Sequence, residues 1–573
     1  MRTLKNHLSF RTVNTFLIIL FLSLIICTIL LGSVPPTSRD ALIHHLFIPK
    51  LYLQHGGIYE IPEFSWSYYP MNLDLLYMVP LFFGNDIIPN YIHFSFAIAT
   101  SWLIYRYLRN KLNSTFGLLG SLFFLSIPIV LKLSITSYVD LGLIFFSTAS
   151  LLFLLEWIEQ GVTLRALLFA GAFCGLALGT KYNGLITLFV LTLLLPILYT
   201  RSPNHGVNNQ TKPLSSIFYG GIFFLTALIC FSPWLIRNFI WTNNPLFPLF
   251  DNWFNHQVTL VQHVTHLDIF SVRRVLFHES GLQILLIPFR VFFEGKDNNP
   301  QFFDGVLNPY LLALPLFAFL KPLKNRTLEF ENHAMLAFVI LTFMLTSFEG
   351  GMRVRYISPI IPFLVILSII GLERILTFSS KTLPFIRARY ANIIGFAIVA
   401  AMLGYNFNYL IEQFRIVQPI NYITGKITRE DYISQFLQEY PVISYINKTL
   451  PQNAKILALY LGNRGYYFDR SVEFDMQNDR STFFDSINQS ESPEKTYHFL
   501  EKRGITHLII RYDLFNNQSQ HILTLQKQSL TEGFFLNFTK KIFENNQYGL
   551  LELGEYNVLL DKPVLSPITP RIN

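Results

Sequence analysis

The sequence predicts a polytopic α-helical membrane protein of about 11 transmembrane helices, followed by a small C-terminal extracytoplasmic α/β domain. First, 51% of the 573 residues are hydrophobic and only 14% are charged, whereas roughly a quarter of the residues of a soluble domain are charged. Second, apolar runs long enough to cross a bilayer recur along most of the chain. Third, beyond about residue 415 these runs shorten to strand length. This composition excludes a soluble enzyme.

The first expected transmembrane helix lies at residues 15–32. No charged residue occurs between Thr12 and Ser38, and the basic residues Arg2 and Arg11 precede the run. A cleaved signal peptide has a similar basic start, but this run is long and lacks a small-x-small cleavage site. We therefore expect a retained helix that crosses a hydrocarbon core of roughly 30 Å.

Ten further apolar runs have the length and composition of membrane spans. They lie at about 86–108, 114–133, 138–157, 165–180, 183–200, 214–234, 306–320, 334–348, 355–375 and 390–410. The loops on one face of this arrangement carry about 16 Lys and Arg residues, against about six on the other face. The positive-inside rule therefore predicts an integral protein of the plasma (inner) membrane, with a cytoplasmic N-terminus and everything after about residue 406 outside.

Three extracytoplasmic segments are expected to be large. Two are loops, at 34–85 and 237–305, within a transmembrane catalytic domain of residues 1–413. Each contains an apolar stretch too short for a span, at 71–83 and 281–293, which is typical of interfacial or re-entrant segments.

The third segment is the separate domain of residues 414–573. Its sequence predicts helices near 429–447, 493–503 and 518–530, which alternate with strands at 455–460, 506–511 and 549–553.

Ionisable residues at span ends are candidates for function, because burying them in a membrane is costly. Asp40 follows the first span, and Asp140 lies at the outer end of the fourth. Capping of a helix N-terminus is the alternative interpretation of each. Lys181, Arg353 and Arg355 are cations on the outer face, where positive charge is sparse. Arg pairs suit phosphate oxygens, whereas snorkelling towards lipid headgroups is the alternative.

Several short motifs in this order resemble the GT-C superfamily of integral membrane glycosyltransferases. That superfamily includes protein O-mannosyltransferases and the aminoarabinose transferases that modify lipid A. The motifs are DALIHH at 40–45, PKLYL at 49–53, GGI at 56–58, YVD at 138–140, GTKY at 179–182, PWLIRN at 233–238, NP at 244–245 and RYISP at 355–359. Each motif alone is weak, and their order and placement together carry the resemblance.

The resemblance implies roles for individual side chains. Asp40 matches the catalytic base of the first loop, and Asp140 matches the acid of the second. Positions near the donor phosphate are matched by Lys181, Arg237, Arg353 and Arg355, and positions that orient acceptor or donor by His44, His45 and Tyr182. Ala41 departs from the family pattern, since many relatives carry a second acid beside the first. No metal-binding residues are therefore assigned, and a divalent metal, for which His263 and His266 offer weak ligands, is left open.

The implied reaction moves a sugar from a polyprenyl phosphate to an extracytoplasmic hydroxyl or amine of a glycan, lipid or protein acceptor. Asp40 would accept the acceptor's proton, and single displacement would invert the anomeric centre. The bilayer and the lipid-linked sugar are the expected partners. The net charge of +8 suggests no nucleic-acid partner, because no basic stripe interleaved with aromatic residues accompanies it. A transporter or flippase of lipid-linked sugars and a non-catalytic membrane assembly subunit are the alternatives.

Overall fold

The computed structural model describes residues 2–203, 212–255, 269–320, 325–347, 351–382, 388–475, 481–545 and 547–556. The chain forms two compact units. The first, here called the helical unit, comprises Met1–Val34, Tyr68–Val258 and His263–Ile423. The second, the sheet unit, comprises Pro35–Ser67, Thr259–Gln262 and Thr424–Asn573. The loop that follows the first helix therefore belongs to the same unit as the C-terminal part of the chain.

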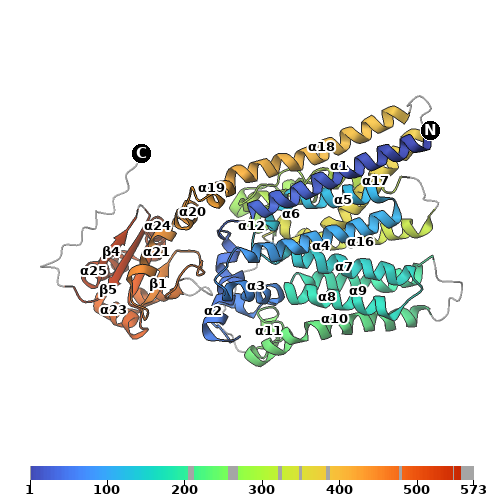
Figure 1. Ribbon diagram of the computed structural model, residues 1–573. Coiled ribbons are helices and arrows are strands. Elements are labelled where there is room, and N and C mark those ends of the chain that lie inside the picture. The colour runs from blue at the N-terminus through green and yellow to red at the C-terminus, as the bar shows by residue number, and fades with distance from the viewer. Residues whose placement is uncertain are drawn as a thin grey trace. The chain divides into compact units, whose positions relative to one another are not determined.

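Long helices build the helical unit and lie side by side in Figure 1. They are α1 (Arg2–Leu31), α4 (Ile88–Lys111), α5 (Ser114–Ser126), α7 (Asp140–Glu159), α8 (Leu164–Thr180), α9 (Gly184–Arg201), α10 (Lys212–Thr242), α16 (Arg326–Ser347), α17 (Ile361–Thr382) and α18 (Ala388–Val417). The short helix α6 (Pro128–Ser134) directly follows α5. The shorter helices are α3 (Asn72–Phe82), α11 (Asp251–Phe254), α12 (Ile269–Phe277), α13 (Gly281–Leu285), α14 (Ile287–Arg290), α15 (Tyr310–Phe317) and α19 (Pro419–Ile423), with 3₁₀ turns η3 (Pro300–Phe302), η4 (Val354–Tyr356) and η5 (Ser358–Ile360).

Seven of the described helices are long and apolar enough to cross a membrane, or eight if α5 and α6 form one span. The chain is therefore an integral membrane protein, but the predicted number of about 11 spans is not confirmed. The run at 306–320 forms α15, which has only 8 residues. At 1.5 Å per residue it is about 12 Å long, too short to cross a bilayer.

The run at 114–133, predicted as one span, is broken. Helix α5 ends at Ser126, and α6 starts at Pro128 with a bend of 67° between the two. Proline lacks a backbone N–H and restricts the preceding residue to extended conformations, and Ile127 has φ −55° and ψ 131°. The N–H of Ile129 donates to the carbonyl of Val306, so the break fastens α6 to the segment before α15.

Small residues allow close packing between α8 and α10. A Cβ atom added at Gly175 would lie 2.4 Å from the Ala227 carbonyl oxygen, and one added at Gly171 would lie 2.8 Å from that of Phe223. Such close backbone approach is how membrane helices gain van der Waals contact when lipid offers no hydrophobic driving force. The sequence AGAFCG of α8 therefore selects its partner helix.

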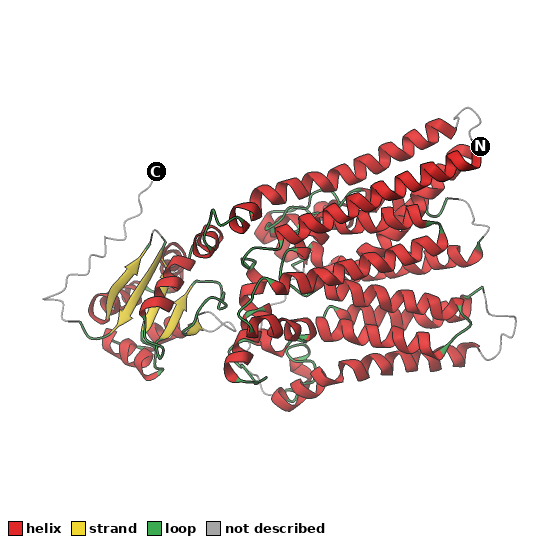
Figure 2. Ribbon diagram, viewed as in Figure 1, coloured by secondary structure: helices red, strands yellow, loops and turns green. Residues whose placement is uncertain are grey.

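A five-stranded sheet organises the sheet unit (Figure 2). Its order is β2 (Ser471–Phe474), β1 (Lys455–Leu459), β3 (His507–Arg511), β5 (Tyr548–Leu553) and β4 (Thr539–Glu544). The β2–β1–β3 pairs are parallel, whereas β5 runs antiparallel to both neighbours. The predicted strands at 455–460, 506–511 and 549–553 correspond to β1, β3 and β5. Strands β2 and β4 were not predicted from the sequence, because their buried and exposed residues do not alternate regularly.

Helices complete the sheet unit. They are η1 (Ala41–His45, a π-helix), α2 (Phe47–His55), α20 (Arg429–Phe436), α21 (Tyr440–Thr449), α22 (Thr482–Gln489), α23 (Pro493–Lys502), α24 (Tyr512–Ile522) and α25 (Leu525–Phe538), and η2 (Ser65–Tyr68) lies where the chain passes between the units. The core contains Leu457, Phe483, Leu508 and Phe534, all fully buried. Apolar strand residues thus pack against the apolar faces of α22 and α25, as in other layered α/β folds.

Candidate functional site

Asp140 and Lys181 form an ion pair at one end of the helical unit. Asp140 is the first residue of α7, and Lys181 directly follows the last residue of α8. The helices are joined by a short connection, so the start of α7 and the end of α8 lie at the same end of this helical hairpin. The Lys181 Nζ lies 2.8 Å from the Asp140 Oδ1. Asp140 is fully buried, whereas the Lys181 side chain is 19% exposed.

Two cations gather around one aromatic ring beside this pair. Arg355 belongs to η4, and its guanidinium centre lies 5.4 Å from the Tyr138 ring and 5.6 Å from the Tyr356 ring. The Lys181 Nζ lies 5.5 Å from the same Tyr356 ring. Such cation–π contacts hold cations without neutralising their charge. With Asp140 as the counter-charge, the group of Asp140, Lys181 and Arg355 keeps a net charge of +1.

His93 anchors the helix that begins at Asp140, and the sequence analysis missed it. Its Nε2 accepts a hydrogen bond from the Leu141 N–H at 2.9 Å. Its Nδ1 lies 3.0 Å from the Leu133 carbonyl and 2.8 Å from that of Thr136. Carbonyl oxygens only accept, so the ring is protonated at Nδ1. A lone histidine in an apolar run gives no signal of this role.

Neither acid uses its carboxylate as a helix cap. Val139, and not Asp140, precedes α7 as its N-cap residue. Asp40 does occupy the N-cap position of η1, but its side chain makes no capping hydrogen bond. The alternative interpretation of both residues as caps therefore has no support in the described geometry. The Oδ2 of Asp140 is buried and has no hydrogen-bond partner among the described residues.

Arg237 and Tyr182 meet through a buried asparagine. The Arg237 guanidinium lies between two indole rings of α10, 4.5 Å from Trp234 and 4.8 Å from Trp241. It donates to the Asn238 Oδ1 at 2.8 Å. Asn238 is fully buried and donates to the Tyr182 hydroxyl at 3.0 Å.

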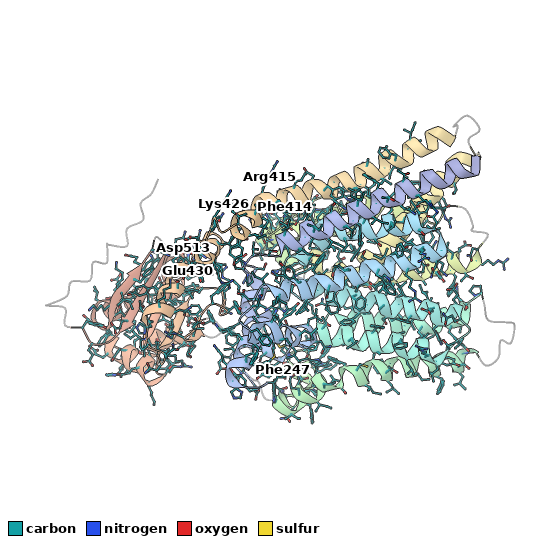
Figure 3. The ribbon with its side chains drawn as sticks, in the orientation of Figure 1. Phe247, Phe414, Arg415, Lys426, Glu430 and Asp513 are labelled. Carbon is teal, nitrogen blue, oxygen red and sulfur yellow. The ribbon has the colours of Figure 1, made fainter. Side chains whose placement is uncertain are left out.

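The same network reaches the segment after α10. The Tyr182 hydroxyl donates to the Phe247 carbonyl at 2.9 Å, and the Asn238 Nδ2 lies 3.2 Å from that oxygen. Phe247 is labelled in Figure 3, beyond the end of α10. The edge of the Tyr69 ring packs against Tyr182 at a centroid distance of 5.1 Å. Tyr182 and Arg237 were predicted from the sequence as site residues, whereas Asn238, which directly follows Arg237, was not.

Arg353 lies in a separate ion network. It contacts Asp304 at 3.4 Å, and Asp304 also contacts Lys132 at 3.2 Å. Lys132 in turn lies 3.1 Å from Asp297. Burial raises the pKa of the Asp304 carboxyl, but Lys132 and Arg353 outweigh burial and lower that pKa below its usual value. The charge of Arg353 is thus countered by the acid Asp304.

Asp40, His44 and His45 lie in the sheet unit. Asp40 precedes η1, and the His44 ring stacks on Trp66 with centroids 5.0 Å apart. His45 is buried, and its ring centroid lies 3.9 Å from that of His44. Stacking on Trp66 orients the His44 ring, and burial restricts that of His45.

The segment that carries Asp40 is fastened to the loop between β1 and β2. Lys50 donates to the carbonyls of Tyr466 and Phe468, both at 2.8 Å, and contacts Asp469 at 3.0 Å. The Tyr466 N–H donates to the Leu42 carbonyl at 3.2 Å. These contacts join residues more than 400 positions apart in the chain, so local sequence patterns could not predict them.

No group of three or more His, Cys, Asp or Glu side chains in the described part of the chain could hold a metal ion. His263 and His266 lie outside the described residues.

Residues 79–237 match the family model described as dolichyl-phosphate-mannose-protein mannosyltransferase. This range contains Asp140, Lys181, Tyr182 and Arg237. No curated protein matches the chain in sequence.

Solved structures resemble almost the whole chain. ArnT from Cupriavidus metallidurans in the apo state has a TM-score of 0.54 and 14% identity, and the match covers 94% of this chain and 98% of ArnT. The same protein bound to undecaprenyl phosphate gives 0.54 and 15%, over 93% and 97% of the chains.

The oligosaccharyltransferase of Archaeoglobus fulgidus, tethered to an acceptor peptide with an NVT sequon, gives 0.51 and 11%, over 94% and 74%. At such identities the likeness shows the fold. The chain has the fold of GT-C membrane glycosyltransferases, and the predicted resemblance to that superfamily is confirmed.

Proposed function

We propose that the protein is an inverting membrane glycosyltransferase. It moves a sugar from a polyprenyl-phosphate-linked donor to an acceptor hydroxyl or amine on the extracytoplasmic side of the inner membrane. The observation that carries the proposal is the buried Asp140–Lys181 pair with Arg355 beside it, at one end of a bundle with the GT-C fold.

The net positive charge of this group suits a phosphate ester. Lys181 and Arg355 stand near one tyrosine ring, and Lys181 pairs with a buried carboxylate. Cations held in place in a region of low dielectric stabilise negative charge that builds on a leaving phosphate oxygen. Asp140 fixes the position of Lys181. Arg237 supplies further positive charge on the donor side, whereas the charge of Arg353 is countered by Asp304.

Asp40 acts as the general base. The attacking acceptor oxygen or nitrogen forms a bond to the anomeric carbon, and its proton passes to the Asp40 carboxylate. The bond from the anomeric carbon to the phosphate oxygen breaks, and the electron pair leaves with the polyprenyl phosphate. General-base assistance of this kind contributes about 10² to 10⁴ in rate. His44, His45 and Tyr182 orient the acceptor and the donor sugar.

The comparisons support the choice of donor. The family model that matches residues 79–237 is described by a dolichyl-phosphate-linked mannose, and the ArnT structure holds undecaprenyl phosphate. Both are polyprenyl phosphates. The Archaeoglobus fulgidus structure holds a peptide acceptor. This supports an acceptor molecule separate from the donor lipid, and that acceptor is a glycan, a lipid or a protein.

Mass spectrometry of co-purifying lipids tests the proposal. The Asp40→Asn variant and the wild type are purified in mild detergent. A polyprenyl phosphate that carries one sugar, enriched on the variant, is expected, because the donor binds but is not consumed. Asp513→Asn is the matched control, since Asp513 is a half-exposed carboxylate of the sheet unit (Figure 3). Equal loading of wild type and variant would favour a carrier, and bulk phospholipid alone would contradict the donor assignment.

A further inference from the structure

A cavity lined by both polar and apolar side chains lies at the end of the helical unit opposite the Asp140–Lys181 pair. Its volume is about 250 Å³, and its charged lining residues are Arg106, Lys111, Glu156, Glu159 and Glu331. They come from the C-terminal turns of α4 and α7 and from the start of α16. Helix α7 begins at Asp140 and ends at Glu159, and at 1.5 Å per residue its 20 residues separate the two places by about 30 Å. The cavity is therefore distinct from the candidate site.

A hydrogen-bonded ion network forms one wall of the cavity. The Lys111 Nζ lies 2.8 Å from Glu331 and 2.9 Å from Glu159, and the Tyr107 hydroxyl donates to Glu331 at 2.6 Å. The Glu331 side chain is only 3% exposed. Both of its oxygens are therefore engaged, and Lys111 is already neutralised. The part of this wall around Glu331 is shielded from solvent, whereas the Glu159 side chain is 48% exposed.

The other wall, formed by Arg106 and Glu156, is looser. Arg106 and Glu156 lie 3.7 Å apart, with side chains 48% and 31% exposed. Glu156 and Glu159 are three residues apart on α7, and therefore project from the same face with like charges. Three carboxylates and two cations line the cavity, which leaves a net charge of −1. An added cation would balance this excess, because Glu159 and Glu331 share the cation of Lys111.

A residue pair typical of the membrane interface lies beside the cavity. Trp102 is 56% exposed on α4, and the Arg106 guanidinium lies 5.7 Å from its ring. Exposed tryptophan beside arginine near the end of a span is typical of the membrane interface. A volume of about 250 Å³ accommodates about eight water-sized groups of about 30 Å³ each, which is enough for a small headgroup.

We propose that this cavity binds the headgroup of a phospholipid with a primary ammonium group, of the phosphatidylethanolamine class. The ammonium group donates hydrogen bonds to Glu156 and Glu159, and the phosphate lies against Arg106. Charge-assisted bonds of this kind need N–H donors. A quaternary ammonium group has none, so a choline headgroup loses them.

Native mass spectrometry of the full chain in detergent tests the proposal. Delipidated protein is titrated with phosphatidylethanolamine and with phosphatidylcholine of identical acyl chains. The expected result is at least a tenfold preference for phosphatidylethanolamine. The variant Glu156→Gln with Glu159→Gln is expected to lose that preference. Glu329→Gln is the matched control, because Glu329 lies near the same end of α16 and does not line the cavity.

Three outcomes would overturn the proposal. Equal binding of the two lipids by the wild type is the first, and it needs no variant. The second is an unchanged preference in the double variant, or in Glu156→Gln alone if the double variant does not fold. The third uses the soluble headgroup: if O-phosphoethanolamine stabilises the protein against heat as much as the lipid does, the ligand is a soluble amine and not a lipid.

Discussion

The Lys181 Nζ lies 2.8 Å from the Oδ1 of the fully buried Asp140. This pair joins the first residue of α7 to the residue after α8, and it places one cation and one carboxylate where Arg355 supplies a second cation. A buried pair is strongly destabilising to break, because the remaining charge is left without compensation.

A double-mutant cycle on Asp140 and Lys181 measures that coupling. Lys181→Met leaves the Asp140 carboxylate buried without its cation, and we expect it to lower the free energy of unfolding by about 3–5 kcal/mol. Asp140→Asn combined with Lys181→Met is expected to cost less than the sum of the single changes, with a coupling of about 1–3 kcal/mol. Unfolding in mixed detergent micelles gives both values. Additive costs would show that the two side chains do not stabilise each other.

Arg355→Lys tests whether the planar guanidinium is needed for transfer. Its flat group lies near the rings of Tyr138 and Tyr356, and an ammonium group reproduces the charge but not the forked donors. We expect the rate of sugar transfer to fall about 10²-fold or more, with expression unchanged. Lys132→Met is the comparison, because Lys132 pairs with Asp297 and Asp304 and lies outside this group. A larger loss with Lys132→Met would move the donor site to that network.

Gly465→Val is expected to disturb the segment that carries Asp40. A Cβ atom at Gly465 would lie 2.3 Å from the ring of the buried Phe47, and overpacking of this kind costs about 1–3 kcal/mol. Limited proteolysis should cut the region 35–67 faster, and transfer should fall. Gly57→Ala is the control, since nothing lies within 4 Å of an added Cβ there. Unchanged proteolysis would show that the contact with Phe47 does not hold the segment.

Asp475→Asn tests the acid dependence of the sheet unit. Burial raises the pKa of Asp475 to about 6, against the hydrogen bonds from Phe483 and Ser481 that lower it. The folded state therefore holds its proton more tightly than the unfolded state. The contribution of Asp475 to stability is greatest at acidic pH and falls as the pH rises from about 4 to about 6, by at most about 3 kcal/mol.

Hydrogen exchange of the β1 and β2 amides measures this effect. In the wild type, exchange corrected for its intrinsic pH dependence should report weaker protection at pH 7 than at pH 5. The side-chain amide that replaces the carboxyl group in Asp475→Asn does not titrate, so the variant should lose that difference. A difference that persists in the variant would assign the pH dependence to another group.

Much of the helical framework could be predicted from apolar runs. Within a bilayer every backbone polar group must be paired inside its own segment, so an uncharged run of sufficient length has no alternative to a helix. The runs at 138–157 and 183–200 accordingly form α7 and α9. The run at 114–133 was wrongly predicted as one span, because a single residue, Pro128, breaks the helix.

Candidate residues could be named because charge in a membrane protein is sparse and costly. Asp140 and Lys181 were both predicted, and the structure brings them together. The separation of Arg355 from Arg353 was not predictable, because it depends on Asp304, a residue about 50 positions away in the chain. Neighbours in sequence therefore stand in different electrostatic environments.

The sequence by itself determined that this chain is an integral membrane protein and which ionisable residues it keeps near its span ends, because both follow from local composition. Only the tertiary structure decided the partners of those residues. His93 against the start of α7 and Lys50 against the Tyr466 carbonyl depend on packing between segments far apart in the chain. Local composition does not predict such contacts. Many side chains would fit the same apolar pattern, but only one tertiary arrangement brings these atoms within hydrogen-bonding distance.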